Sequence, residues 1–376
     1  MTDNPPSPGA STHGHFPAHT GPRVWLLSSG DSPIGLSIAR QILAHGDYVV
    51  LGLVPPDFDR DDSRSADFDT FMDEVDKNVE NGWKERLRAT VLDVRMMGKC
   101  QAATAGAVHA FGKIDILLCC TSQAIIGSVE ELAVSHRTQT LVRDQFETNY
   151  FGPVNIMKAT LPHMRKQKSG HIMVLGGITG HIGTPGLGVY CAAGWALEGF
   201  CDSIAYEIAP FNIKLTILQC SIEIGILTNL ITSVPPILPA YSPSSNNAPL
   251  FRGIMNTLLS RLPINANKNQ QTPSQGERQE DSGPFASADV VSFYPPLSPA
   301  HLENLTAETV HAITAIAGHE NPPARHIVGQ EGVASVKEKL KTVSEELEDF
   351  IETSCAADIN SDGSVARAVK EDSREE

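Results

Sequence analysis

The sequence has few aromatic residues, a shortage of cations and no long apolar run. Aromatic residues make up 6% of the 376 residues, and 29 Lys and Arg face 44 Asp and Glu, which gives a formal net charge of −15. This acidity argues against a nucleic-acid-binding surface. No apolar segment approaches the roughly 20 residues that a membrane-spanning helix needs. Residues 1–22 lack the basic start and apolar core of a signal peptide. We therefore expect a soluble, cytoplasmic protein.

Cysteine is present without a pairing pattern. The chain has seven cysteines, an odd number, and no two are spaced as CxxC. Most of them lie inside apolar segments, which is typical of buried, reduced thiols in a cytosolic protein. We therefore expect neither a disulfide framework nor a metal site.

Short apolar segments alternate with amphipathic ones along most of the chain. The segments that read as strands are Val24–Ser28, Tyr48–Val54, Ala89–Val94, Ile114–Cys120, His171–Leu175, Lys214–Leu218 and Arg325–Val328. Those that read as helices are Pro33–His45, Phe68–Val79, Met97–Phe111, Arg143–Met164, Leu187–Ala209, Leu250–Leu262, Ala307–Ala317 and Val333–Phe350. Strands that are apolar throughout and alternate with helices predict an α/β fold with a parallel sheet covered on both faces.

Polar stretches mark the limits of this pattern. Residues 1–22 and 353–376 read as disordered tails, the second of them acidic. Residues 23–352 read as one domain that carries a flexible Asn-, Gln-, Ser- and Pro-rich insert at about 263–300. Within this insert, Val290–Tyr294 is apolar enough to dock locally. The acidic stretch 55–88 reads as an irregular excursion with a helix inside it.

The turn after the first strand has two open interpretations. It reads Ser28-Ser29-Gly30-Asp31-Ser32-Pro33-Ile34-Gly35, so two glycines are available, and Ser32 is placed to donate to a phosphate at the helix N-terminus. Against a phosphate stand the negative charge of Asp31 and the missing amide of Pro33. In the other interpretation, Asp31 or Ser32 caps a helix that has proline at its first position.

Several motifs together give the chain a family resemblance. They are Asp115-Ile116-Leu117-Leu118, Gln145-Phe146-Glu147-Thr148-Asn149-Tyr150-Phe151-Gly152, Leu161-Pro162-His163-Met164, Ser169-Gly170-His171-Ile172, Tyr190 and Ala196-Leu197-Glu198-Gly199-Phe200. In this order they resemble the short-chain dehydrogenase/reductase family, especially its steroid- and retinol-type members, over roughly 23–262 and 305–350. The resemblance implies a Rossmann-type, doubly wound sheet and hydride transfer between NAD or NADP and an alcohol or carbonyl.

The resemblance also implies site residues. Tyr190 and Asn149 match the family's catalytic residues, and Gly30, Ser32, Ile34, Gly35 and Asp93 match its cofactor contacts. A lipophilic small-molecule substrate is implied, and so is a homodimer formed through the helix that carries Ala192, Ala193, Gly194 and Ala196.

The departures from the family pattern fall on the chemistry. The family's serine, thirteen residues before the tyrosine, falls on Gly177, and its lysine, four residues after the tyrosine, falls on Gly194. Its NNAG motif appears as Cys119-Cys120-Thr121-Ser122. A tyrosine without the lysine titrates near 10, so alcohol oxidation, which needs the phenolate, suffers most. Weak or lost activity is therefore expected.

Three side groups have alternative interpretations. His181 is a candidate proton relay, although a loop histidine is more often a surface residue. Asn149 also fits an ordinary helix-bending amide. The family architecture would bring Cys119, Cys120, Cys191 and Cys220 near one cleft. They could form a soft-metal or redox site there. The favoured interpretation is that they are small buried hydrophobic residues.

Three functions follow from the sequence. The first is an NAD(P)-dependent oxidoreductase with an altered proton relay. The second is a non-catalytic member that binds a dinucleotide or a partner, and the third is a dimeric interaction module. Because function resides in the site and not in the fold, the site geometry has to separate them.

Overall fold

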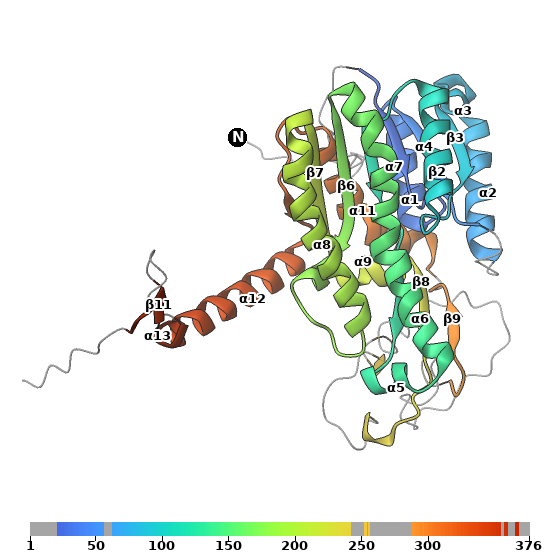
Figure 1. Cartoon of the computed structure of the whole chain (residues 1–376). Helices are drawn as coiled ribbons and strands as arrows, with labels where there is room; N and C mark the ends of the chain where they lie inside the picture. The colour runs from blue at the N-terminus through green and yellow to red at the C-terminus, as the bar shows by residue number, and fades with distance from the viewer. Residues whose placement is uncertain are drawn as a thin grey trace, which may run out of the picture. The chain divides into compact units, whose positions relative to one another are not determined.

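Seven parallel strands form the central sheet (Figure 1). A computed structural model describes residues 21–55, 62–241, 252–253, 255, 287–295, 297–354, 357–359 and 365–367. Contacts divide the chain into two compact units, Met1–Gly332 and Val333–Glu376. The sheet belongs to the first unit, and its strand order is β10-β7-β6-β4-β1-β2-β3.

The strands lie close to where the apolar segments predict them. They are β1 (Val24–Leu27), β2 (Tyr48–Leu53), β3 (Leu87–Val91), β4 (Ile116–Cys119), β6 (Gly170–Gly177), β7 (Ile213–Cys220) and β10 (Arg325–Ile327). The strands β1 and β4 are buried along their whole length. One boundary prediction is wrong: the third strand ends before Asp93, because the Met96 amide bonds back to the Asp93 carbonyl oxygen and turns the chain.

Helices cover both faces of the sheet, which confirms the predicted doubly wound Rossmann-type fold. On one face, α1 (Pro33–Ala44), α2 (Asp62–Lys77) and α11 (Pro299–Ala317) share one apolar cluster with side chains of the strands. On the other face, α4 (Met97–Phe111), α7 (Gly152–Gln167) and α8 (Gly188–Ile208) share a second cluster. The strand order reverses between β1 and β4, and ligands of open α/β sheets bind at such a reversal.

Two predictions about the acidic excursion and the insert need correction. The helix expected at 68–79 is α2, which begins at Asp62. The insert expected to continue to residue 300 ends earlier, since α11 begins at Pro299, where the Ser298 hydroxyl accepts a hydrogen bond from the His301 amide and proline occupies the first turn. A serine cap followed by proline starts a helix well, so the signal was present in the sequence.

A small three-stranded sheet was not predicted. It pairs β5 (Gln123–Ile126) in parallel with β8 (Leu230–Ser233), and β8 antiparallel with β9 (Val291–Phe293). The segment Val290–Tyr294, expected to dock locally, supplies β9. Short connecting helices surround this sheet: α5 (Val129–Ala133), α6 (His136–Phe146) and α9 (Ile222–Leu227).

Some predictions fall largely outside the described residues. These are the tail at 1–22, the helix at 250–262, most of the insert at 263–286 and much of 353–376. In the second unit, α12 (Gln330–Asp349) continues from Gly332 and is followed by α13 (Ile351–Ser354). The part expected as a tail also holds a short antiparallel pair, β11 (Ala357–Ile359) and β12 (Val365–Arg367). Among the described residues, no helix combines the length and apolarity that a membrane crossing requires.

Two glycines let α1 approach the sheet. A Cβ at Gly30 would lie 2.5 Å from the Cβ of Leu51 on β2, and a Cβ at Gly35 would overlap the Ser29 carbonyl oxygen. The Gly30 amide also donates to the Gly52 carbonyl oxygen at 2.7 Å. Both glycines are therefore required by packing alone, whether or not a nucleotide binds.

We expect Gly35→Ala to lower the free energy of unfolding by about 1–3 kcal/mol, because its added methyl group meets backbone that has no room to move. The matched control is Gly106→Ala on α4, where an added Cβ meets nothing within 4 Å. That change should raise stability by about 0.5–1 kcal/mol. Urea unfolding of the three proteins measures both. Equal stability of the Gly35 variant and the wild type would show that this contact does not constrain the fold.

Candidate functional site

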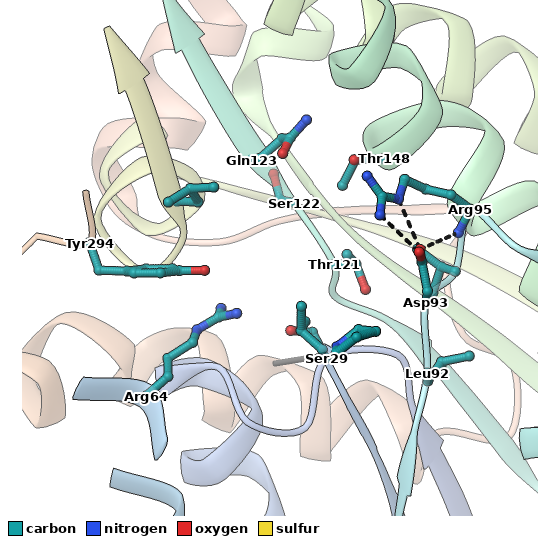
Figure 2. Close-up of a pocket in the computed structure, with 14 residues that line it drawn as sticks. Ser29, Arg64, Leu92, Asp93, Arg95, Thr121, Ser122, Gln123, Thr148 and Tyr294 are labelled. Carbon is teal, nitrogen blue, oxygen red and sulfur yellow. Dashed lines mark hydrogen bonds and ion pairs between the residues drawn. The ribbon is translucent and has the colours of Figure 1, made fainter. Parts of the chain in front are cut away.

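A pocket lies at the carboxyl ends of β1, β2 and β4, where the strand order reverses (Figure 2). Its lining residues are Ser29, Val54, Pro55, Arg64, Leu92, Asp93, Val94, Arg95, Thr121, Ser122, Gln123, Thr148, Leu230 and Tyr294. They come from the first turn, the ends of β2, β3 and β4, helix α2 and the small sheet. The pocket therefore lies where the fold predicts a nucleotide site.

Ser32 and Ile34, both predicted cofactor contacts, have structural roles. The Ser32 hydroxyl donates to the Ser29 carbonyl oxygen at 2.7 Å and accepts from the Gly35 amide at 3.1 Å. It is the N-cap of α1, as the second interpretation of this turn has it. The Ile34 side chain is fully buried in the core beneath α1. Neither side chain lines the pocket.

Asp31 turns its carboxylate toward the end of β2. The carboxylate accepts hydrogen bonds from the Val54 amide at 3.1 Å and the Ser29 hydroxyl at 3.4 Å. Burial raises the pKa of this carboxyl group, while the nearby charge of Arg64 acts in the opposite direction. The negative charge that Asp31 brings to the phosphate loop is thus hydrogen-bonded to the Val54 backbone and lies near the charge of Arg64.

Asp93 lines the pocket, as predicted, but its carboxylate is already paired. Arg95 donates to it from Nε at 2.9 Å and from Nη2 at 2.8 Å, and the Arg95 backbone amide adds a third bond at 3.0 Å (Figure 2). Burial works against the charged form, yet the bonds from Arg95 hold the pKa of Asp93 below its usual value. Asp93 therefore presents an ionised, partnered carboxylate at the pocket wall.

Arg64 is a pocket cation that no sequence motif singles out. It is only 7% exposed, its guanidinium lies 4.6 Å from the centre of the Tyr294 ring, and its Nε is buried without a hydrogen-bond partner. In the described ranges no carboxylate forms an ion pair with it. Figure 2 shows the guanidinium between Tyr294 and Ser29. A buried guanidinium whose donors are not all used is suited to receive an anion.

Asn149 lies in a π-helical turn, Glu147–Phe151, between α6 and α7. Its side-chain oxygen accepts from the Gln123 amide at 3.0 Å, and its Nδ2 donates to the Gln123 carbonyl oxygen at 2.9 Å. Nδ2 also lies 3.4 Å from the Ser122 hydroxyl. Asn149 thus fixes β5 against the helix, which favours its interpretation as a bending and packing amide.

Tyr190 lies near the start of α8 and is buried. Burial raises the pKa of Tyr190 to about 12, and a hydrogen bond with the Ser122 side chain offsets this only in part. The hydroxyl lies against α9, so that a Cβ on Gly225 would be 2.5 Å from it. Ser122 therefore joins the two predicted catalytic residues, Asn149 and Tyr190, in one polar chain. No cation within the described part of the molecule is hydrogen-bonded to the hydroxyl.

The positions of the two missing family groups share one neighbour. A Cβ at Gly177 would lie 3.1 Å from the Thr179 hydroxyl oxygen, and a Cβ at Gly194 would lie 3.9 Å from the same atom. Thr179 is buried. Its hydroxyl thus occupies the space between the two positions where the family carries serine and lysine.

His181 belongs to a different network. Its Nε2 lies 3.0 Å from Oε1 of Gln219, whose Nε2 donates to Glu198 at 2.7 Å. Glu198 in turn accepts from Arg325 at 3.0 Å. This network links α8 to β7 and β10, so His181 fits a structural role better than the proton relay considered for it.

The four cysteines expected near one cleft are divided by the sheet. Cys119 packs in the cluster under α4 and α7, whereas Cys120 and Cys220 pack in the cluster under α1, and Cys191 packs near Tyr190. Burial raises the pKa of Cys120 to about 11 and that of Cys220 to about 12. The four thiols therefore do not form one cluster, because the neighbouring residues Cys119 and Cys120 point to opposite faces of the sheet. In the described ranges, no group of three or more His, Cys, Asp or Glu is arranged to hold a metal.

Sequence reasoning missed Arg64, Ser122, Thr179 and Tyr294. A sequence signal for Ser122 existed, since it stands at the position of the glycine in the family's NNAG motif. Arg64 and Tyr294 lie in segments outside any motif and 230 residues apart, so only the fold brings them together.

The burial of Tyr190 predicts how its hydroxyl ionises. The difference in phenolate absorbance between the wild type and Tyr190→Phe should stay near zero up to pH ~10, where an ordinary tyrosine is half ionised. The physical reason is the burial that raises its pKa to about 12. Half of the phenolate signal appearing at or below pH ~10 would mean that a cation acidifies the hydroxyl.

Comparisons with known proteins agree with this architecture. The family model described as short chain dehydrogenase matches residues 23–229, more than half of the chain. Oxidoreductase BOA17 of Botryotinia fuckeliana is 32% identical over 197 residues, which cover 52% of this chain and 64% of that protein. Human 17-beta-hydroxysteroid dehydrogenase type 1 is 33% identical over 134 residues, covering 36% and 39%. The aligned regions thus span less than two thirds of these curated relatives.

A solved structure extends the match beyond the region of sequence similarity. A short-chain dehydrogenase from Streptomyces avermitilis aligns with 88% of this chain and 98% of its own, with a TM-score of 0.55 and 22% identity. At this identity the match supports the fold alone. Together with the family model and the steroid-type relative, it confirms the resemblance found in the sequence. The chain belongs to the short-chain dehydrogenase family.

Proposed function

We propose that this chain binds NADP(H) in the pocket at the end of β1, β2 and β4, and that it no longer oxidises alcohols. One observation carries the proposal: the two ends of the cleft differ. Cations line the pocket near β2 and β3. Tyr190 lies behind the lining residue Ser122, and no cation among the described residues is hydrogen-bonded to its hydroxyl. The protein would then be a dinucleotide-binding member of an oxidoreductase family with a regulatory role.

The adenosine end of the pocket fits a phosphorylated nucleotide. Arg64 offers a buried guanidinium with an unused Nε donor, and the charge of Asp31 is directed to the Val54 amide. The side chains of Leu92 and Val94 supply an apolar wall beside Asp93. Val54 and Pro55, the described residues that follow β2, have no carboxylate for a ribose hydroxyl, so the cation favours NADP over NAD. When bound, the cofactor would supply or accept a hydride.

The nicotinamide end lacks the groups that a dehydrogenase needs. With a pKa of about 12, Tyr190 is phenolate in only about one molecule in 10⁵ at pH 7. Alcohol oxidation needs that phenolate as its base. A missing donor at Gly177 removes stabilisation worth about 3 kcal/mol from the developing oxyanion. Helix α9 also covers the hydroxyl, so a substrate would have to displace it.

Carbonyl reduction is the second candidate function. A neutral phenol is the form that donates a proton to a carbonyl oxygen, and burial keeps Tyr190 in this form. The similarity to a steroid dehydrogenase makes lipophilic carbonyl compounds the first to try. The cytoplasmic location and the homodimer through α8 stay predictions.

The binding prediction tests Arg64. NADPH should bind to the wild type, and Arg64→Met should weaken it about 10–100-fold, because a charge-assisted hydrogen bond contributes about 1.5–3 kcal/mol. The affinity for NADH, which lacks the extra phosphate, should change much less on the same substitution. The control is Arg40→Met, which removes a guanidinium paired with Glu74 outside the pocket. Calorimetric titration of the three proteins with each nucleotide measures the affinities. If the wild type binds neither nucleotide, the proposal fails as a whole.

The second prediction rebuilds the missing groups. Gly177→Ser and Gly194→Lys should be combined with Thr179→Ala, since the Thr179 hydroxyl crowds the first position. A lysine at 194 lies one helical turn from Tyr190, so it should lower the tyrosine pKa. Alcohol oxidation should rise at least ~100-fold over the wild type.

The control for the rebuilt site carries methionine in place of lysine at 194, with the other two changes kept. It has nearly the same volume and no charge, so it should leave the tyrosine pKa near that of the wild type. If the lysine variant binds NADPH and yet shows neither a lower pKa nor turnover, the missing cation is not what stops the reaction.

A further inference from the structure

The helix α12 carries an apolar stripe with a strict seven-residue repeat. Val333, Val336, Leu340, Val343, Leu347 and Phe350 alternate at spacings of three and four residues. A 3.5-residue period is the pattern of helices that wrap around one another, because it keeps the same face toward the partner over several turns. An ordinary helix packed on a globular core needs no such regularity.

The second half of this stripe is exposed to solvent. Leu340, Val343, Leu347 and Phe350 are 57%, 45%, 59% and 65% exposed, and Ile351 beside them is 50% exposed. Apolar residues scattered singly on a surface need no explanation, but a contiguous row on one helix face marks an interaction site.

The charges on α12 are separated along its length. Lys337, Lys339 and Lys341 lie around the middle of the helix, with Glu338 among them and Glu331 in the first turn. The last turns hold Glu345, Glu346, Glu348 and Asp349 and no cation. Acidic residues near a helix C-terminus oppose the helix dipole, so this arrangement is unfavourable for the helix alone. Only the exposed Lys341–Glu345 pair, at 3.7 Å, offsets it within the helix.

We propose that α12 pairs with α12 of a second copy of this chain in antiparallel orientation. The apolar stripes then face each other, and Lys337, Lys339 and Glu346 flank the stripe, so the lysines of each copy lie toward the carboxylate of the other. Parallel pairing would place like charges side by side. The charge pattern of a single sequence is thus complementary to itself, which favours a second copy over an unrelated partner. This interface is independent of the nucleotide pocket.

Sedimentation velocity of the full chain over a wide concentration range provides the first test. The wild type should associate reversibly to a dimer, and Leu340→Gln with Leu347→Gln should weaken the dimer at least ~10-fold. The matched control is Tyr206→Gln, which replaces an apolar side chain 84% exposed on α8. It should leave the dimer unchanged, whereas a loss there would assign the interface to α8.

Charge reversal tests the orientation without touching the apolar stripe. Changing Lys337, Lys339 and Lys341 to Glu should weaken the dimer, because an antiparallel pair would then align carboxylates with carboxylates. Changing Glu345, Glu346 and Glu348 to Lys should do the same, and mixing the two variants should restore association. Circular dichroism of each variant shows whether the helix remains folded.

Three results would overturn the proposal. A wild type that stays monomeric at every concentration means that no second copy covers the stripe. A dimer that survives both glutamine changes forms elsewhere. If the variant with the three lysines changed to glutamate dimerises as well as the wild type, the antiparallel arrangement is ruled out. In a parallel pair that change would only replace contacts between lysines by contacts between glutamates.

Discussion

A polar group removed from water has to find a partner inside the protein, and the cleft of this chain satisfies that requirement unevenly. At one end the Tyr190 hydroxyl has a single hydroxyl neighbour, Ser122, and burial therefore holds it in its neutral form. At the other end the Arg64 guanidinium is buried with a donor unused. The Tyr190 hydroxyl thus has a hydrogen-bond partner and stays protonated, whereas Arg64 has a donor that an anion could accept from. The proposed function follows from this contrast.

Several family-motif residues of the site also have roles in the fold itself. Gly30 and Gly35 remain because helix α1 cannot approach the sheet without them. Asn149 remains because it holds the backbone of Gln123 at the edge of the small sheet. These residues have packing roles that do not depend on catalysis. Gly177 and Gly194, where the family resemblance predicts serine and lysine, both lie near the Thr179 hydroxyl.

The sequence allowed the fold to be predicted well, since apolar strands such as Ile116–Cys119 and helices such as Gly188–Ile208 give strong local patterns. It also predicts departures from the family motif at Gly177 and Gly194, because that motif has fixed spacing around Tyr190. It could not place Arg64 beside Tyr294, since their contact depends on the tertiary fold. The division of Cys119 from Cys120 by the sheet was predictable from strand alternation. The environment of Tyr190 was not, because burial and the position of α9 arise only once the chain has folded.

The pairing of β8 with β9 has an evolutionary consequence. Ser233 at the end of one strand faces Val291 at the beginning of the other, so the chain leaves the small sheet and returns to it at the same edge. The entropy of closing such an excursion grows only with the logarithm of its length, about 0.6 kcal/mol for each doubling. Changes of length between these two strands that spare Arg252 and Met255, which pack against the body, would therefore be nearly neutral for it. Relatives are free to diverge here in size and composition, while Tyr294, just after the return, keeps its place over the pocket.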